Sequence, residues 1–295
     1  MIEARLHDGS ALPVEVHGTG PVTVLLPVDP RPADGARAEE LRRWGVDPDL
    51  GPSLVRGLTD AGFRVAAFAY EHHLMAHPRP DALTPDTVTA DLLAVADAAG
   101  AGRFAYYGYS WLALSGLQLA LRTERLAALA MGGFPPLGGP YAEMLRVTRA
   151  AHAMAASAAG SRETPGGATA PDDYDWSSVE VSATEAQTRQ FVTLYEALRG
   201  FDERAALARL RCPRLCFAGS ADTIPYGEGW GGVTVDIGGA VAAGRAELAS
   251  AGWTVRLLDG LDHTQAMQPA HVLPVLLPWL TASRSTLDGA ARPPR

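Results

Sequence analysis

The sequence predicts an α/β fold with a mostly parallel central sheet and helices on both of its faces. Two observations lead to this prediction. Short, continuously apolar runs alternate along the chain with longer segments of helical pattern, which is typical of buried parallel strands joined by crossover helices. Glycine and proline separate these segments and mark the turns. The 295 residues can bury a full core and suit one such domain with an insertion.

The strands are predicted from runs of apolar, aromatic and β-branched residues bounded by turn residues. A turn signal, His7-Asp8-Gly9-Ser10, separates the first two, and the later runs are apolar throughout. The predicted strands cover residues 2–6, 12–17, 22–26, 63–70, 104–109, 126–131, 214–218 and 254–258.

The helices are predicted from their apolar pattern and from the residues at their ends. Thr84 and Pro85 supply an N-cap and a first-turn proline, and Gly62 ends the helix before them. The predicted helices cover residues 38–61, 85–99, 111–121, 141–157, 183–198, 203–210, 239–251 and 268–283.

Residues 140–210 interrupt the alternation, because they contain helical patterns and no convincing strand. We therefore predict a core formed by residues 1–139 and 211–295, with 140–210 as a helical cap or lid over one rim of the sheet. A Gly/Ser/Thr/Pro-rich stretch at 160–178 has the composition of a mobile loop. The tail 287–295 is expected to be disordered.

Composition narrows the possible partners and the compartment. The formal net charge is −8 and no basic stripe occurs, which argues against nucleic acid as a partner. No apolar run is long enough to cross a membrane and no signal peptide is recognised, so a cytoplasmic protein is expected. All 25 basic residues are arginine, and asparagine is absent too, which is typical of a GC-rich bacterial genome. Cys212 and Cys216 are interpreted as small buried residues and not as a disulfide.

The segment Gly108-Tyr109-Ser110-Trp111 carries the strongest functional signal. An aromatic strand stops at the glycine, presents one serine and passes at once into a helix. Such a strand-turn-helix exposes the serine hydroxyl, with the backbone N–H groups of a helix N-terminus behind it. Ser110 is therefore the candidate nucleophile.

A serine nucleophile needs a base to take its proton and a third group to orient that base. Asp222 follows a buried strand in the segment Gly219-Ser220-Ala221-Asp222, and His263 follows the last predicted strand. Because the carboxyl ends of parallel strands lie at one edge of a sheet, both side chains are expected near Ser110. The chain order serine, acid, histidine is that of an elbow serine in an α/β sheet.

These three segments resemble the α/β-hydrolase fold superfamily over nearly the whole chain. The resemblance implies that Ser110 is the nucleophile, His263 the general base and Asp222 its orienting acid, and that 140–210 is the family's variable cap. It also implies an oxyanion hole with the Trp111 N–H as one donor. The family's His-Gly pair, which usually supplies the second donor, is replaced by Pro27-Val28, so that donor is by position Asp29 or Val28.

Two departures from the family pattern bear on the chemistry. Leu112 occupies the position of a small residue two places after the serine and crowds the turn. Asp29 brings a carboxylate to the oxyanion loop, where a negative charge would oppose the transition state. Either Asp29 points away, with Arg31 as its partner, or it is a second acid/base in a non-hydrolytic reaction.

The predicted protein is a cofactor-independent and metal-free serine hydrolase acting on an ester, lactone or thioester of an apolar small molecule. An acyltransferase, or a lyase or cyclase that uses Asp29, is the alternative and would suit secondary metabolism. A non-enzymatic ligand-binding protein on the same fold is a second alternative. Monomer and homodimer both remain open. The candidate pocket residues are Tyr109, His72, Tyr226 and Trp230.

Overall fold

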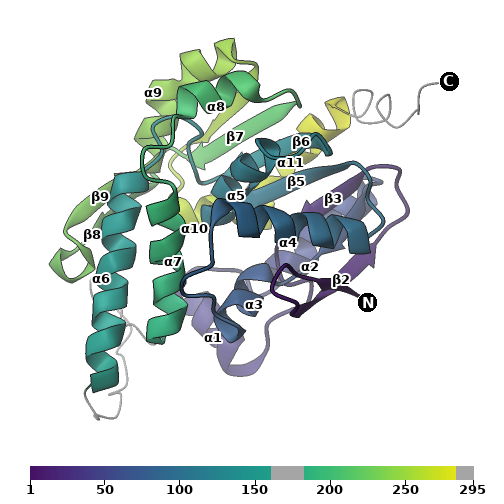
Figure 1. Cartoon of the computed structure of the whole chain (residues 1–295). Coiled ribbons are helices and arrows are strands. Elements are labelled where there is room, and N and C mark those ends of the chain that lie inside the picture. The colour runs from purple at the N-terminus through teal and green to yellow at the C-terminus, as the bar shows by residue number, and fades with distance from the viewer. Residues whose placement is uncertain (161–182, 284–295) are drawn as a thin grey trace.

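The computed structural model describes residues 1–160 and 183–283. Its central sheet has eight strands in the order β1-β2-β4-β3-β5-β6-β7-β10, and β8 and β9 form a separate hairpin (Figure 1). β1 pairs antiparallel with β2 and β2 pairs antiparallel with β4, whereas β4, β3, β5, β6, β7 and β10 pair in parallel, which confirms the predicted mostly parallel sheet. The strands are β1 Ile2–Arg5, β2 Ala11–His17, β3 Thr23–Leu26, β4 Arg64–Ala67, β5 Phe104–Tyr109, β6 Leu126–Gly132, β7 Arg214–Gly219, β8 Thr223–Tyr226, β9 Val233–Asp236 and β10 Trp253–Leu258.

Helices cover both faces of the sheet. α2 and α11 pack on one face, and α4, α5 and α9 pack on the other. The helices α6 and α7 lie side by side at one end of the molecule. The helices are α1 Gly35–Arg43, α2 Leu50–Asp60, α3 Tyr70–Ala76, α4 Pro85–Ala98, α5 Trp111–Ala120, α6 Tyr141–Gly160, α7 Glu185–Ala197, α8 Glu203–Arg209, α9 Ile237–Ser250, α10 His263–Ala266 and α11 Pro269–Ala282, with a 3-10 turn, η2, at Glu228–Trp230.

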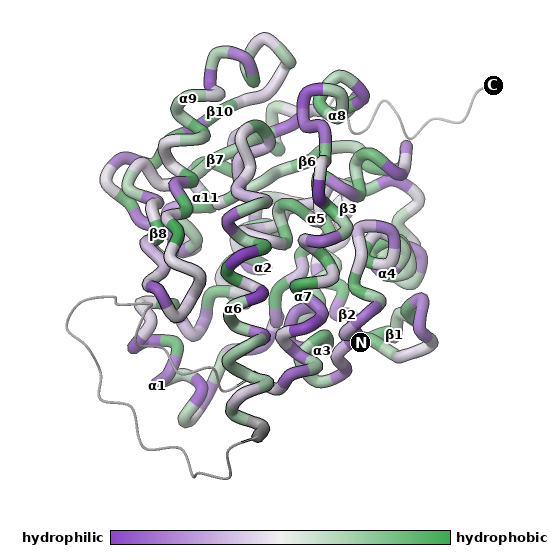
Figure 2. Tube along the Cα trace, turned by 60° about the vertical axis from the view of Figure 1, so that its left-hand side comes forward, coloured by the Kyte–Doolittle hydropathy of each residue, from purple (hydrophilic) through white to green (hydrophobic). Residues whose placement is uncertain are grey.

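Strand β5 is apolar on both faces because each face meets a helical layer. Phe104 and Tyr106 join the cluster under α4 and α5, whereas Ala105 and Tyr107 join the cluster under α2 and α11. The same two-sided burial explains why the central strands β6 and β7 carry mostly hydrophobic colours in Figure 2, while the peripheral helix α6 is mixed. The continuous apolar runs of the sequence therefore correspond to strands buried on both sides.

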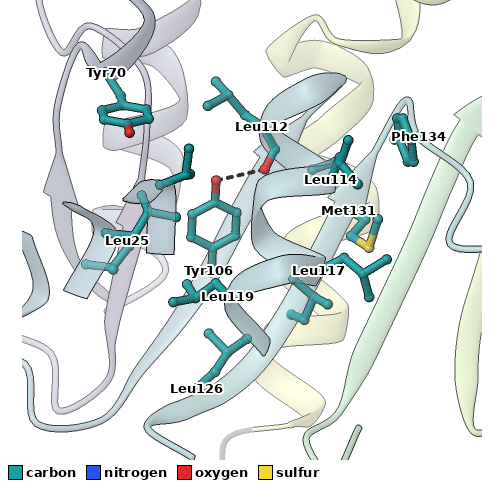
Figure 3. Close-up of a cluster of buried hydrophobic side chains, with 14 of the residues drawn as sticks. Leu25, Tyr70, Tyr106, Leu112, Leu114, Leu117, Leu119, Leu126, Met131 and Phe134 are labelled. Atoms are coloured by element: carbon teal, nitrogen blue, oxygen red, sulfur yellow. Dashed lines mark hydrogen bonds between the residues drawn. The ribbon is translucent and has the colours of Figure 1, made fainter. Parts of the chain in front are cut away.

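Figure 3 shows how the core holds the start of α5. The Tyr106 hydroxyl donates a hydrogen bond of 2.8 Å to the Leu112 carbonyl oxygen, deep among leucine side chains such as Leu117 and Leu126. Burial raises the pKa of this phenol far above its ordinary value, so the hydroxyl remains a donor. The strand that carries Ser110 is thus tied to the helix that follows Ser110.

The structure confirms some of the predicted elements and changes the bounds of others. Thr84 caps α4 with a capping box, as its sequence indicated. The helix predicted over 38–61 is two helices, because Gly45 has a left-handed φ of 68° and Pro48 follows it. The strand predicted over 63–70 ends earlier, at Ala67, and Tyr70 begins the helix α3.

Two further elements were not predicted. The segment after Asp222 forms the β8–β9 hairpin, with Pro225 on a two-stranded ribbon where a missing N–H is tolerated. The short helix α10 begins at His263, and Asp262 caps it. Residues 161–178 of the predicted mobile stretch and the predicted disordered tail 287–295 lie outside the described residues.

A buried carboxylate fixes α3 and the loop after it against α4. Asp91 is fully buried and accepts hydrogen bonds from the His7 backbone N–H (3.0 Å), the Tyr70 hydroxyl (2.8 Å) and Arg79 (2.5 Å), with the His7 imidazole 2.8 Å away. Arg79 also lies 2.7 Å from Asp8, and its backbone N–H donates to Gln190 of α7. This cluster joins α3, α4, α7 and the first turn of the chain.

The substitution Asp91→Ala is expected to lower the free energy of unfolding by about 3–5 kcal/mol, because it leaves the buried Arg79 without its main counter-charge. Urea denaturation followed by circular dichroism measures the loss. Asp97→Ala is the matched control on the same helix, since Asp97 is 67% exposed in its pair with Arg125 and is expected to cost about 0–1 kcal/mol. Equal losses in the two variants would contradict a structural role for the Asp91 cluster.

Candidate active site

The carboxyl ends of the parallel strands form one rim that carries the predicted catalytic residues. Ser110 follows β5, Asp222 follows β7 and His263 follows β10. The loop after β3 brings Asp29 to the same rim. This placement is the one expected for an open parallel sheet, where ligands bind outside the strand carboxyl ends.

Ser110 has a strained backbone, with φ 56° and ψ −131°, and is the one non-glycine residue of positive φ in the described chain. Its N–H donates to the Gly132 carbonyl oxygen at 2.8 Å, which anchors the turn to β6. A β-carbon on Gly108 would lie 2.4 Å from the Leu112 oxygen, so this turn requires glycine there. Leu112 fits because its side chain is buried in the core. Such strain persists only where the surroundings enforce it.

Asp222 and His263 form a hydrogen-bonded pair. The Asp222 Oδ2 lies 2.9 Å from the His263 Nδ1, with Asp222 fully buried and the His263 side chain 17% exposed. The Asp222 carbonyl oxygen accepts from the backbone N–H groups of Ile237 (3.0 Å) and Gly238 (2.9 Å), which fixes its loop at the start of α9. With Nδ1 bonded to the carboxylate, the His263 Nε2 is the nitrogen left to accept a proton.

The last residue of β6 and the residue that follows it lie beside Ser110 and His263. Gly132 accepts the hydrogen bond from the Ser110 N–H, and the next residue, Gly133, lies against the His263 ring. A β-carbon on Gly133, whose φ is 62°, would lie 3.0 Å from the His263 Cε1 and 2.6 Å from the Tyr109 ring. The glycine pair therefore leaves room for the imidazole beside the serine turn.

Tyr109 contacts His263 through a hydrogen bond and through its ring. Its hydroxyl donates a 2.7 Å hydrogen bond to the His263 carbonyl oxygen, and its ring centroid is 5.1 Å from that of the imidazole. Burial raises the pKa of the Tyr109 phenol well above its ordinary value, and the nearby Asp222 charge adds to this. The sequence suggested Tyr109 as a pocket residue. In the structure its hydroxyl holds the backbone of His263.

The oxyanion loop leaves one of its two candidate amides free. The Val28 N–H donates to the Leu26 carbonyl oxygen at 2.9 Å, whereas the Asp29 N–H makes no hydrogen bond within the described residues. The Trp111 N–H, at the first position of α5, has no partner inside its helix. Asp29 and Trp111 are therefore the two amides of this rim that can serve as donors.

The Asp29 carboxylate is paired within its own loop. Its Oδ1 accepts from the Arg31 backbone N–H and from the Arg31 Nε, both at 3.1 Å, and its Oδ2 accepts from Nη2 at 3.3 Å. The side chain is 43% exposed. This arrangement matches the first of the two alternatives that the sequence left open, in which Asp29 has Arg31 as its partner.

The other predicted pocket residues lie on three separate elements. Tyr226 ends β8 near Asp222, and burial together with that charge raises its pKa to about 12. Trp230 belongs to η2 and is half-buried, and His72 is exposed on α3. The neighbouring His73 is buried, with its Nε2 3.0 Å from the Ser10 hydroxyl.

The structure adds a contact that sequence reasoning missed. The Trp111 indole N–H donates to the Glu71 carboxylate at 3.3 Å, and the Trp111 ring meets Phe191 of α7 edge-on at 5.4 Å. The residue after Ser110 therefore touches α3 on one side and a helix of the 140–210 segment on the other. No local pattern signals a contact between residues 40 positions apart.

Two features of residues 1–160 and 183–283 bear on the class of site. Within these residues, no three histidine, cysteine or acidic side chains are placed to hold a metal ion together. None of their helices has the length and hydropathy needed to span a membrane.

Comparison with known proteins agrees with this architecture. A carboxylesterase structure from Nitrososphaera gargenis superposes with a TM-score of 0.59 at 17% identity, covering 97% of this chain and 99% of that one. An esterase from Thermogutta terrifontis gives 0.58 at 18% identity, with 96% and 98% covered. Epoxide hydrolase A from Mycobacterium thermoresistibile gives 0.55 at 20% identity, with 93% and 96% covered. No family model and no curated protein sequence matches the chain.

These similarities show that the chain has the α/β-hydrolase fold, as the resemblance in its sequence implied. At these identities they establish the architecture and leave the chemistry to the residues of the site. The sequence and the structure agree on where those residues lie.

The substitution Tyr109→Phe is expected to loosen His263 without unfolding the protein. Losing one buried hydrogen bond costs about 1 kcal/mol of stability. The proton shared between the His263 Nδ1 and Asp222 is then expected to exchange faster with water, which broadens its downfield NMR resonance. Tyr107→Phe is the matched control, because Tyr107 stacks on the same Phe217 and its hydroxyl makes no hydrogen bond within the described residues. Equal broadening in both variants would refute the positioning role.

Proposed function

We propose that the protein is a serine hydrolase that cleaves an ester, lactone or thioester of an apolar small molecule through an acyl-enzyme. The observation that carries the proposal is the strained Ser110 turn on the same rim as the Asp222–His263 hydrogen bond of 2.9 Å. A serine with positive φ at the end of a parallel strand is a costly arrangement with no structural need of its own. The esterase and epoxide hydrolase among the similar structures support hydrolysis as the reaction class.

In the first half-reaction, the Ser110 Oγ attacks the carbonyl carbon while the His263 Nε2 accepts the hydroxyl proton. The carbonyl oxygen becomes an oxyanion, which the Trp111 and Asp29 N–H groups stabilise. The carbon–oxygen or carbon–sulfur bond then breaks, and the leaving group takes the proton from the His263 imidazolium. The acyl group remains as an ester of Ser110.

In the second half-reaction, water attacks the acyl carbon and gives its proton to the His263 Nε2. The tetrahedral intermediate collapses, the Ser110 Oγ recovers the proton and the carboxylic acid leaves. The role of Asp222 is to hold the imidazole in the tautomer with a free Nε2 and to stabilise the transient imidazolium. Its complete burial strengthens this interaction, because little water screens the charges.

The segment 140–210 is proposed as the cap of this site. The support comes from α7, whose Phe191 packs on Trp111 directly after the nucleophile. A cap helix in contact with Trp111 would border the acyl group, and aromatic walls favour an apolar substrate. Tyr226, Trp230 and His72 remain predicted members of the pocket.

The lyase or cyclase alternative depends on Asp29 acting as an acid or base, and an acyltransferase depends on excluding water. The Arg31 pair weighs against the lyase or cyclase, because both carboxylate oxygens of Asp29 already accept hydrogen bonds from Arg31. The Arg31 guanidinium also offsets the negative charge of Asp29, which would otherwise oppose an oxyanion held by the N–H groups of this loop. Hydrolysis is therefore favoured over a reaction in which Asp29 transfers protons.

A fluorophosphonate probe is expected to label the wild-type protein at Ser110, because the probe phosphonylates activated serines. Mass spectrometry of the labelled peptide identifies the site. Ser110→Ala and His263→Ala are expected to abolish labelling, and Asp222→Asn is expected to lower hydrolysis of p-nitrophenyl butyrate about 10⁴-fold. Ser115→Ala, which changes a buried serine of α5 bonded to the Trp111 carbonyl oxygen, is the control that keeps labelling. Absence of labelling in the wild type would favour a ligand-binding protein.

Asp29→Ala distinguishes hydrolysis from Asp29-dependent chemistry. For the hydrolase, the backbone N–H remains in place, so kcat/KM for the same ester is expected to stay within about ten-fold of wild type. Arg31→Ala is the partner control, because it leaves Asp29 charged and without its guanidinium. Loss of all activity in Asp29→Ala, with residual activity in Ser110→Ala, would support a lyase or cyclase and contradict the hydrolase.

A further inference from the structure

A hollow lies at the end of the parallel strands opposite Ser110. It measures about 680 Å³ and is formed where the chain enters β5, β6 and β7. Ser110 lies at the other end of β5, and six extended residues span about 20 Å. The hollow is therefore separate from the proposed catalytic rim. Its lining includes Arg103, Arg122, Arg209, Arg211, Cys212 and Leu121.

The hollow concentrates positive charge on a protein of net charge −8. Its lining includes four arginines and a single carboxylate, that of Glu124. The arginines come from three connections distant in the sequence: Arg103 precedes β5, Arg122 precedes β6, and Arg209 and Arg211 precede β7. The fold thus brings like charges together.

The existing contacts leave most of this charge uncompensated. Arg122 is paired with Asp86 at 2.6 Å. Arg209 donates to the Leu121 carbonyl oxygen at 3.1 Å, and Arg211 donates to the Ala208 carbonyl oxygen at 3.3 Å, so neither is bonded to a carboxylate. Arg103 makes no hydrogen bond or ion pair within the described residues. Guanidinium groups with free donors bind phosphate and carboxylate oxygens, often through two bonds at once.

The same hollow has an aliphatic part. Ala120, Leu121 and Pro213 are partly exposed along its wall, beside the half-buried Cys212. We propose that the hollow binds a phosphate ester of a small aliphatic alcohol, with the phosphate on Arg103 and Arg211 and the alkyl group on the aliphatic wall. A volume of about 680 Å³ is in the range of small-molecule sites.

The chain contains its own reporter for this site. Of its two cysteines, Cys216 is fully buried and Cys212 lines the hollow. A thiol reagent therefore modifies Cys212 in the folded protein, and a ligand in the hollow slows that modification. Burial raises the pKa of the Cys212 thiol, while Arg214 and Arg103 oppose this effect. Each variant is accordingly compared with its own rate in the absence of ligand.

The experiment measures the modification rate of Cys212 against the concentration of n-hexyl phosphate, with isothermal titration calorimetry in parallel. We expect saturable protection in the wild type, and at least a ten-fold rise in the half-saturating concentration in Arg103→Gln/Arg211→Gln. Arg199→Gln/Arg245→Gln is the matched control, because it removes two exposed positive charges outside the lining of the hollow. The control is expected to behave as wild type.

Inorganic phosphate and n-hexanol test the two halves of the ligand separately. Both are expected to protect Cys212 at least ten-fold more weakly than n-hexyl phosphate does. Protection by inorganic phosphate at equal concentration would overturn the assignment of an aliphatic phosphate ester. Unchanged Cys212 rates and no heat in the wild type, or an equal loss of binding in the two double variants, would overturn the site itself.

Discussion

The backbone of Ser110 is the constraint on which the rest of the rim depends. A positive φ at a residue with a side chain costs of order 1–3 kcal/mol, so the surrounding structure must enforce it. Three contacts do so: the hydrogen bond from its N–H to Gly132, the close approach of Gly108 to the Leu112 oxygen, and the bond from the Tyr106 hydroxyl to that same oxygen. The core thus fixes Ser110 at the rim. The Leu112 side chain, which is large for its position, is buried in that core.

Two fully buried carboxylates are bonded very differently in this structure. Asp91 uses both oxygens, with donors from the backbone, a phenol and a guanidinium, and so fixes several elements together. Asp222 bonds through Oδ2 alone, and its buried Oδ1 has no hydrogen-bond partner within the described residues. Burying a carboxylate oxygen without a hydrogen bond costs free energy, and such groups in native proteins are often found at functional sites. Here that charge faces the imidazole that is proposed to become positive during the reaction.

The features that sequence reasoning predicted are those encoded locally. The N-cap at Thr84, the elbow at Ser110 and the strand-end positions of Asp222 and His263 each depend on a few adjacent residues and on parallel topology. The missed features depend on distant partners. The Tyr109 hydroxyl meets a carbonyl 154 residues away, and Tyr70 begins a helix while its hydroxyl bonds Asp91. Neither contact leaves a periodic or spacing signal in the chain.

The two ends of the parallel strands differ chemically in this chain. The carboxyl ends of β5, β7 and β10 carry the serine, acid and histidine, while the amino ends of β5, β6 and β7 carry four arginines, of which Arg122 is paired with Asp86. The strands between them are buried on both faces and closely packed, and a tightly packed interior transmits strain, so activity at the rim is an indirect measure of binding at the hollow. Binding at the arginine hollow is therefore best judged by a direct measure such as Cys212 protection.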